Sequence, residues 1–141
     1  MNAYVEKIAH VPPWECGAGP LWGKASGIIV RIGEDVVVSL PVRNPGMTNL
    51  SRMSPALYVK RGDAPFVRMY HDPDHFTREP MPLMAAGDGA LVMTTNPMMG
   101  KPRYDGPQEG DPSRPEMLAF RPETGYQSPQ REIPRWSEDF Y

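Results

Sequence analysis

The sequence has one cysteine, no long apolar run and no targeting segment at its start. Cys16 has no second cysteine to pair with, so an internal disulfide is excluded and the redox compartment stays open. No stretch approaches the roughly 20 apolar residues of a membrane-spanning helix, and residues 1–11 lack the apolar core of a signal peptide. We therefore expect a soluble chain with no membrane partner. It is cytoplasmic as written, provided that Met1 is the true start.

An excess of charge of either sign is also missing. The 15 Lys and Arg residues nearly balance the 17 Asp and Glu residues, which gives a formal net charge of −2. Nucleic-acid binding requires a clustered basic face, and no window of the sequence carries five like charges. Nucleic acid is therefore excluded as a partner.

The sequence also has little helical periodicity and few large aliphatic side chains. No segment sustains apolar residues at i, i+3, i+4 and i+7, so we expect very little helix. Leu, Ile, Val and Phe supply few of the 141 residues, although ten Met residues add adaptable apolar volume. The 13 Gly and 18 Pro residues separate short apolar runs. This punctuation favours many short strands joined by rigid turns.

Two strand-rich blocks of similar layout follow from that punctuation. The first block predicts strands at residues 26–32, 36–42, 57–61 and 66–71. The second predicts strands at 81–84, 90–96, 115–121 and 130–135, with a long polar loop over 97–114. Each block is typical of a four-stranded meander, the unit of a β-propeller blade. The predicted fold is all-β, with two four-stranded antiparallel blades of an incomplete β-propeller.

These blocks set the expected domain organisation. Residues 1–21 form a lead-in segment, residues 22–76 the first blade and residues 77–141 the second blade. A propeller needs at least about four blades to close. We therefore expect the chain to be a fragment of a larger propeller, with the remaining blades or another chain covering the exposed blade face.

Four segments carry a resemblance to a known family. They are residues 19–22, the hairpin at 28–35, residues 77–83 and Gly87-Asp88-Gly89 leading to Asn96-Pro97. In this order they resemble the N-terminal part of bacterial sialidase-like, BNR-repeat propeller proteins, over roughly residues 14–141. The aspartate box of that family, Ser-x-Asp-x-Gly-x-Thr-Trp, is absent, and the nearest fragment, residues 73–77, lacks its glycine and tryptophan.

The resemblance implies an exo-sialidase-like glycoside hydrolase that acts on acidic sugars. Two alternatives remain open at this point. One is a non-catalytic propeller that binds carbohydrate or protein, and the other is a truncated product with no independent activity. Fold alone does not decide among them.

The predicted site residues precede the expected inner strand of each blade, where a propeller's central channel binds ligands. Arg78 is predicted to clamp a sugar carboxylate with its planar fork, and Glu79 is the candidate catalytic acid. The sequence identifies no second carboxylate. The other interpretation is an Arg78–Glu79 network at a blade junction. Trp22 and Lys24 are predicted to bind substrate, with Trp22 as a stacking platform or as packing between blades.

Metal-ligating residue types gather in one stretch, at His71, Asp72, Asp74 and His75. The stretch follows an expected outer strand and lacks the helical frame of a zinc-hydrolase motif. We therefore predict a solvated turn and no metal there. The sequence indicates no cofactor.

Overall fold

The computed structural model describes residues 5–10 and 27–137. These residues contain ten β-strands and two three-residue 3-10 helices, and no α-helix. Within them, no helix is long and apolar enough to cross a membrane. The prediction of an all-β chain with very little helix is confirmed for this part of the sequence.

The first four-stranded sheet is antiparallel throughout, with strand order β1-β2-β5-β6. Tight turns at Gly33 and Gly62, with φ of 60° and 52°, let neighbouring strands reverse. Between β2 and β5 the chain forms a separate hairpin of β3 and β4, which the sequence did not predict. The strands are β1 (Ile29–Ile32), β2 (Asp35–Ser39), β3 (Val42–Arg43), β4 (Met53–Ser54), β5 (Ala56–Arg61) and β6 (Val67–His71).

The second four-stranded sheet is also antiparallel, with strand order β10-β9-β8-β7. Its strands are β7 (Leu83–Ala85), β8 (Leu91–Thr95), β9 (Glu116–Phe120) and β10 (Gln130–Glu132). The helices η1 (Pro122–Thr124) and η2 (Arg135–Ser137) follow β9 and β10. Both sheets match the two predicted meanders. That they are blades of a propeller stays a prediction.

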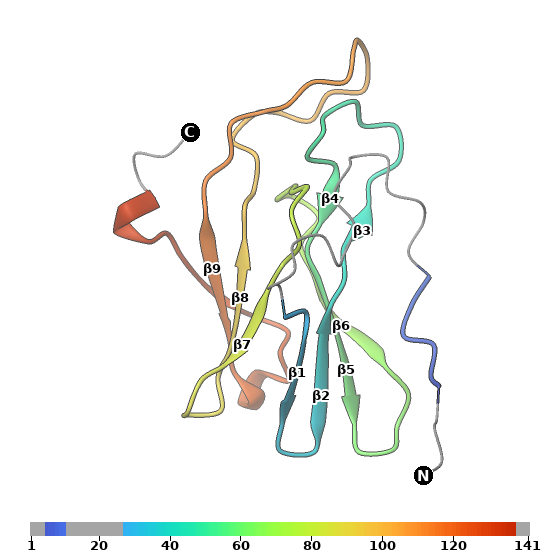
Figure 1. Ribbon diagram of the computed structural model, residues 1–141, viewed down its shortest axis with the longest axis vertical. Helices are drawn as coiled ribbons and strands as arrows, with labels where there is room; N and C mark the ends of the chain where they lie inside the picture. The colour runs from blue at the N-terminus through green and yellow to red at the C-terminus, as the bar shows by residue number, and fades with distance from the viewer. Residues whose placement is uncertain (1–4, 11–26, 138–141) are drawn as a thin grey trace.

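The two sheets are joined at both of their edges. β1 and β7 lie side by side (Figure 1), and the Leu83 amide donates to the Gly27 carbonyl at 2.7 Å. At the opposite edges, Arg131 in β10 pairs with Asp72, which directly follows β6. The first strands of the two meanders are therefore neighbours, and an ion pair links β10 to the end of β6.

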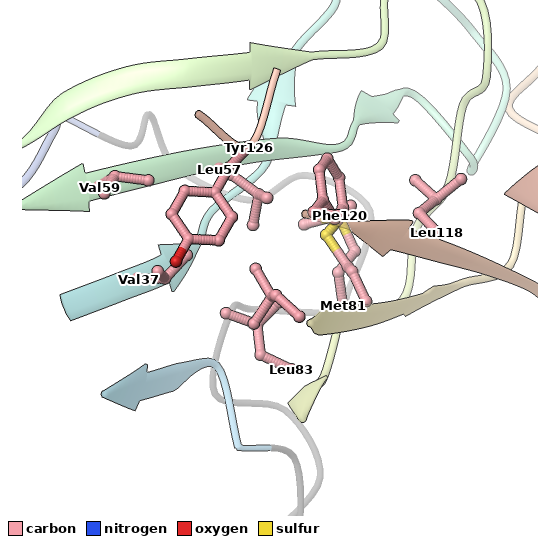
Figure 2. Packing of buried hydrophobic residues seen from close by; sticks show 10 residues of the cluster. Val37, Leu57, Val59, Met81, Leu83, Leu118, Phe120 and Tyr126 are labelled. Atoms are coloured by element: carbon pink, nitrogen blue, oxygen red, sulfur yellow. The ribbon is translucent and has the colours of Figure 1, made fainter. Parts of the chain in front are cut away.

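One hydrophobic core lies between the sheets (Figure 2). Tyr70 of β6 packs its ring edge-on against Phe120 of β9, with centroids 4.9 Å apart. Tyr126 follows η1 in a left-handed conformation, φ 63°, and its side chain is buried in the same core. Because the cluster draws on both sheets, neither buries its apolar face alone. Its members are Val37, Leu57, Val59, Met81, Leu83, Leu91, Met93, Leu118, Phe120 and Tyr126.

Candidate functional site

A polar cavity of about 270 Å³ lies where three loops meet. One wall comes from the loop between β3 and β4, and another from Arg78 and Glu79 in the connection between β6 and β7. The remaining walls come from Asn96, just after β8, and from the end of the long loop before β9. The lining residues are Leu50, Ser51, Arg78, Glu79, Asn96, Gly110, Asp111 and Ser113.

The long loop before β9 is held in place by buried polar groups. Asn49 is fully buried, and its side-chain amide donates to Asp111 Oδ2 at 2.7 Å. Its Oδ1 accepts the Arg103 backbone amide, also at 2.7 Å. Arg103 Nη1 in turn donates to Asp111 Oδ1 at 2.9 Å. This network ties the β3–β4 loop to the long loop, which together form the upper part of the molecule in Figure 1.

Asp111 takes part in both the network and the cavity wall. Its side chain is only 6% exposed, and two residues already donate hydrogen bonds to it. A Cβ added at Gly100 would lie 2.5 Å from Asp111 Oδ1, so the backbone at Gly100 approaches the carboxylate more closely than any other residue type allows. The loop geometry around Asp111 is therefore tightly specified.

The backbone pairing of the preceding residue, Thr77, positions Arg78 and Glu79. Thr77 exchanges hydrogen bonds with Met53 of β4, at 2.7 and 3.0 Å, and its Oγ1 accepts the Glu79 amide at 3.2 Å. Arg78 Nε donates to Glu79 Oε1 at 2.8 Å. With side-chain exposures of 48% and 23%, the pair is partly open to solvent in the cavity wall. Such a pair contributes at most about 1 kcal/mol to stability.

Two of the predicted site residues, Arg78 and Glu79, thus line one cavity, and their role in binding stays a prediction. Trp22 and Lys24 lie outside the described residues. Sequence reasoning missed Asp111, because a contact with Asn49, far away in the chain, brings it to the cavity. Asn96 also lines the cavity and was not predicted as a site residue. The Gly-Asp-Pro sequence at residues 110–112 was interpreted only as a polar loop.

A second cluster of charges lies at the other joined edge of the sheets. The prediction of a solvated turn is wrong for Asp72, whose side chain is only 7% exposed. Arg131 donates to both Asp72 and Glu116, and the Glu116 side chain is only 6% exposed. His75 Nδ1 lies 2.9 Å from Asp72 Oδ1, and the Tyr70 hydroxyl donates to Asp72 Oδ2 at 3.0 Å. Asp72 is buried because it joins the sheets.

The electrostatics of this cluster follow from burial and from its hydrogen bonds. Burial raises the pKa of the Asp72 carboxyl, but the His75 hydrogen bond and charge, with the Asp74 amide and the Tyr70 hydroxyl, outweigh burial. The net pKa of Asp72 therefore lies below its ordinary value. Burial and the neighbouring Asp72 charge raise the pKa of Tyr70, so its hydroxyl keeps its proton. In the described part of the chain, no three His, Cys, Asp or Glu side chains are grouped to hold a metal ion.

No family model, no curated protein and no solved structure matches this chain. The comparisons therefore assign no family. What stands is the architecture: an all-β protein with two four-stranded antiparallel sheets and a hairpin.

Proposed function

We propose that this chain supplies two adjoining blades of a sialidase-like β-propeller and binds an acidic sugar in the cavity beside Arg78. The observation that carries the proposal is the composition of the cavity wall. An exposed arginine, an amide and two hydroxyl groups converge there, at Arg78, Asn96, Ser51 and Ser113. This set can bind one carboxylate and several sugar hydroxyls.

Arg78 provides the charge that the ligand requires. Within residues 5–10 and 27–137 only its Nε is engaged, by Glu79, so its terminal nitrogens can donate to a ligand carboxylate in the bidentate manner of arginine. The cavity, at about 270 Å³, is slightly smaller than typical sites for drug-sized ligands. It therefore suits a single sugar unit.

The arrangement of the sheets supports the propeller part of the proposal. In neighbouring blades, equivalent strands face one another and the sheets share a core. Here β1 neighbours β7, Asp72 at the end of β6 pairs with Arg131 of β10, and one cluster packs between the sheets.

The residues that line the cavity favour sugar binding without hydrolysis. A glycosidase needs two carboxylates, one on each side of the scissile bond, and the cavity does have two, Glu79 and Asp111. Both already accept hydrogen bonds from arginines, however, and Asp111 is buried within the Asn49–Arg103 network. We assign Asp111 to holding the wall and Glu79 to orienting Arg78.

Hydrolysis of an acidic-sugar glycoside in the same cavity is the second candidate function, because the cavity has those two carboxylates. It predicts slow release of a fluorogenic group from an acidic-sugar glycoside, and loss of that release in Glu79→Gln. The binding proposal predicts no release by either protein, while both still bind the free sugar.

Calorimetric titration with N-acetylneuraminic acid, glucuronic acid and glucose tests the binding proposal. We expect the acidic sugars to bind and glucose to bind at least tenfold more weakly. Arg78→Ala should lower acidic-sugar affinity at least tenfold, because a hydrogen bond to a charged group is worth ~1.5–3 kcal/mol. Arg78→Lys should restore little, since a point charge does not reproduce the planar fork.

The matched control is Arg121→Ala. Arg121 forms a similarly exposed pair with Asp88, at 2.5 Å and 53% and 56% exposure, and it does not line the cavity. Its substitution should leave sugar affinity unchanged. If Arg78→Ala lowers the melting temperature but not the affinity, the pair is a junction contact and the proposal is wrong.

A further inference from the structure

A second cavity, of about 250 Å³, lies apart from the Arg78 cavity and shares none of its lining residues. Ser113 and Arg114 are consecutive in the chain but line different cavities, Ser113 the first and Arg114 the second. The second cavity is lined by His75, Pro97, Met98, Met99, Arg114 and Glu116.

Arg114 is the unusual residue of this cavity. Its Nε is buried and has no hydrogen-bond acceptor, and no ion pair or other hydrogen bond of its guanidinium exists among residues 5–10 and 27–137. Only its backbone amide is bonded, to the Pro97 carbonyl at 3.1 Å. A buried donor left without an acceptor is destabilising. Other arginines of the sheets and loops, such as Arg103 and Arg131, have carboxylate partners.

The carboxylate nearest to Arg114 in the sequence, that of Glu116, already has another partner. Glu116 lines the same cavity, but Arg131 donates to it from β10. Asp72 is likewise held by Arg131 and His75. None of the residues that surround Arg114 therefore serves as its acceptor, and a ligand anion in the cavity can accept hydrogen bonds from the terminal nitrogens of its guanidinium.

His75 forms one polar side of the cavity and has a fixed orientation. Its Nδ1 lies 2.9 Å from the buried Asp72 Oδ1, so the imidazole plane is set by its partner. The Nε2 of the ring has no hydrogen bond within the described part of the chain. The ring is thus available to the cavity that it lines.

Three of the lining residues are apolar. Pro97 and Met98 are buried, and Met99 is 50% exposed. Methionine side chains adapt to the shape of an apolar group. The cavity therefore combines a guanidinium and an imidazole with a flexible apolar wall.

We propose that this cavity binds a small organic carboxylate that carries an apolar chain. The carboxylate accepts hydrogen bonds from Arg114, and the apolar chain packs on Met98 and Met99. A compact inorganic anion would leave the methionine wall uncovered, and an alkyl ammonium would meet the unpaired guanidinium.

Titration of the 141-residue chain with four probes at pH 7 tests this proposal. The probes are hexanoate, acetate, inorganic phosphate and hexylammonium, followed by calorimetry and by the NMR resonance of the Arg114 Nε–H. We expect hexanoate to bind at least tenfold more tightly than acetate or phosphate, and hexylammonium not to bind. Saturation with hexanoate should shift the Nε–H resonance.

Variants separate the two parts of the cavity. Arg114→Met keeps the length and apolar character of the side chain and should lower hexanoate affinity at least tenfold. Met99→Ala should weaken hexanoate and leave acetate unchanged. Arg78→Ala, in the other cavity, should leave hexanoate affinity unchanged, so this test is independent of sugar binding.

Several outcomes would overturn the proposal. Unchanged hexanoate affinity in Arg114→Met is one, and phosphate binding as tightly as hexanoate is another. Should Arg114→Met fail to fold, the wild-type titration still decides, because an Arg114 Nε–H resonance that stays in place at saturating hexanoate contradicts the proposed contact.

Discussion

Arg131 and Asp72 form an ion pair that links the last strand of one sheet to the end of the last strand of the other. The same guanidinium donates to Glu116 on the neighbouring strand β9. Both carboxylates are more than nine-tenths buried, so one cation serves two buried anions. Removing it would take a charged partner from both buried carboxylates.

Arg131→Met should therefore lower the free energy of unfolding by about 3 kcal/mol, the loss typical of a buried ion pair from which one partner is removed. Urea denaturation measures it. Arg121→Met, at the exposed pair with Asp88, should lower it by less than about 1 kcal/mol. Equal small losses in the two variants would show that the Arg131 contacts do not join the sheets.

The pKa of Asp72 also predicts how the stability of the folded chain depends on pH. Its pKa in the folded chain lies below the ordinary value, so the folded state holds the carboxylate more readily than the unfolded state does. The resulting stabilisation is fully present above the unfolded pKa of about 4. It is lost as the pH falls through the lower pKa of the folded state.

The comparison of wild type with Asp72→Asn measures this contribution. Urea midpoints determined from pH 6 down to pH 3 should show a stability difference that is constant near pH 6 and shrinks as the pH falls below about 4. A difference that grows on acidification would mean that the pKa of Asp72 is raised in the folded state, contrary to this account.

Gly100 tests the close packing around Asp111. A methyl group there would lie 2.5 Å from Asp111 Oδ1, so Gly100→Ala must displace the carboxylate from Asn49 and Arg103. We expect a loss of about 1–3 kcal/mol in stability. Gly87→Ala is the matched control, because a methyl group at Gly87 meets nothing within 4 Å. A tolerated Gly100→Ala would show that the loop is looser than described.

The shared core predicts that the two sheets unfold together. Leu118 is fully buried, so Leu118→Ala should remove about 2–5 kcal/mol of stability. Because its cluster includes Val37 and Leu57, amide hydrogen exchange should accelerate in β2 and β5 as well as in β8 and β9. Met84→Ala, at a side chain that is 61% exposed, should change neither the stability nor the rates of amide exchange. Acceleration confined to the second sheet would indicate two independent units.

The strands could be predicted from the sequence because glycine-containing turns mark their ends. Gly33-Glu34-Asp35 and Gly87-Asp88-Gly89 separate apolar runs, and the observed strands begin or end within about two residues of most predicted bounds. The β3–β4 hairpin was missed because each strand is only two residues long, too short for an alternating pattern to appear.

The sites were predictable only in part, for a different reason. Arg78 and Glu79 are adjacent in sequence, and their pairing is local. Asp111 reaches the same cavity through Asn49, which is 62 positions away. Asp72 was expected in solvent because its local sequence is polar, whereas it is buried and bonded to Arg131, 59 positions away. Local patterns carry no information about such contacts.

The most direct test of the central claim is an amide NMR titration of the chain with N-acetylneuraminic acid. If the Arg78 cavity is the binding site, resonances of Arg78, Glu79, Asn96 and Ser113 should shift together along one binding curve, while those of Asp88 and Arg121 stay in place. Saturating sugar that moves none of the cavity resonances, or that moves them equally in Arg78→Ala, would contradict the proposal that this cavity binds an acidic sugar.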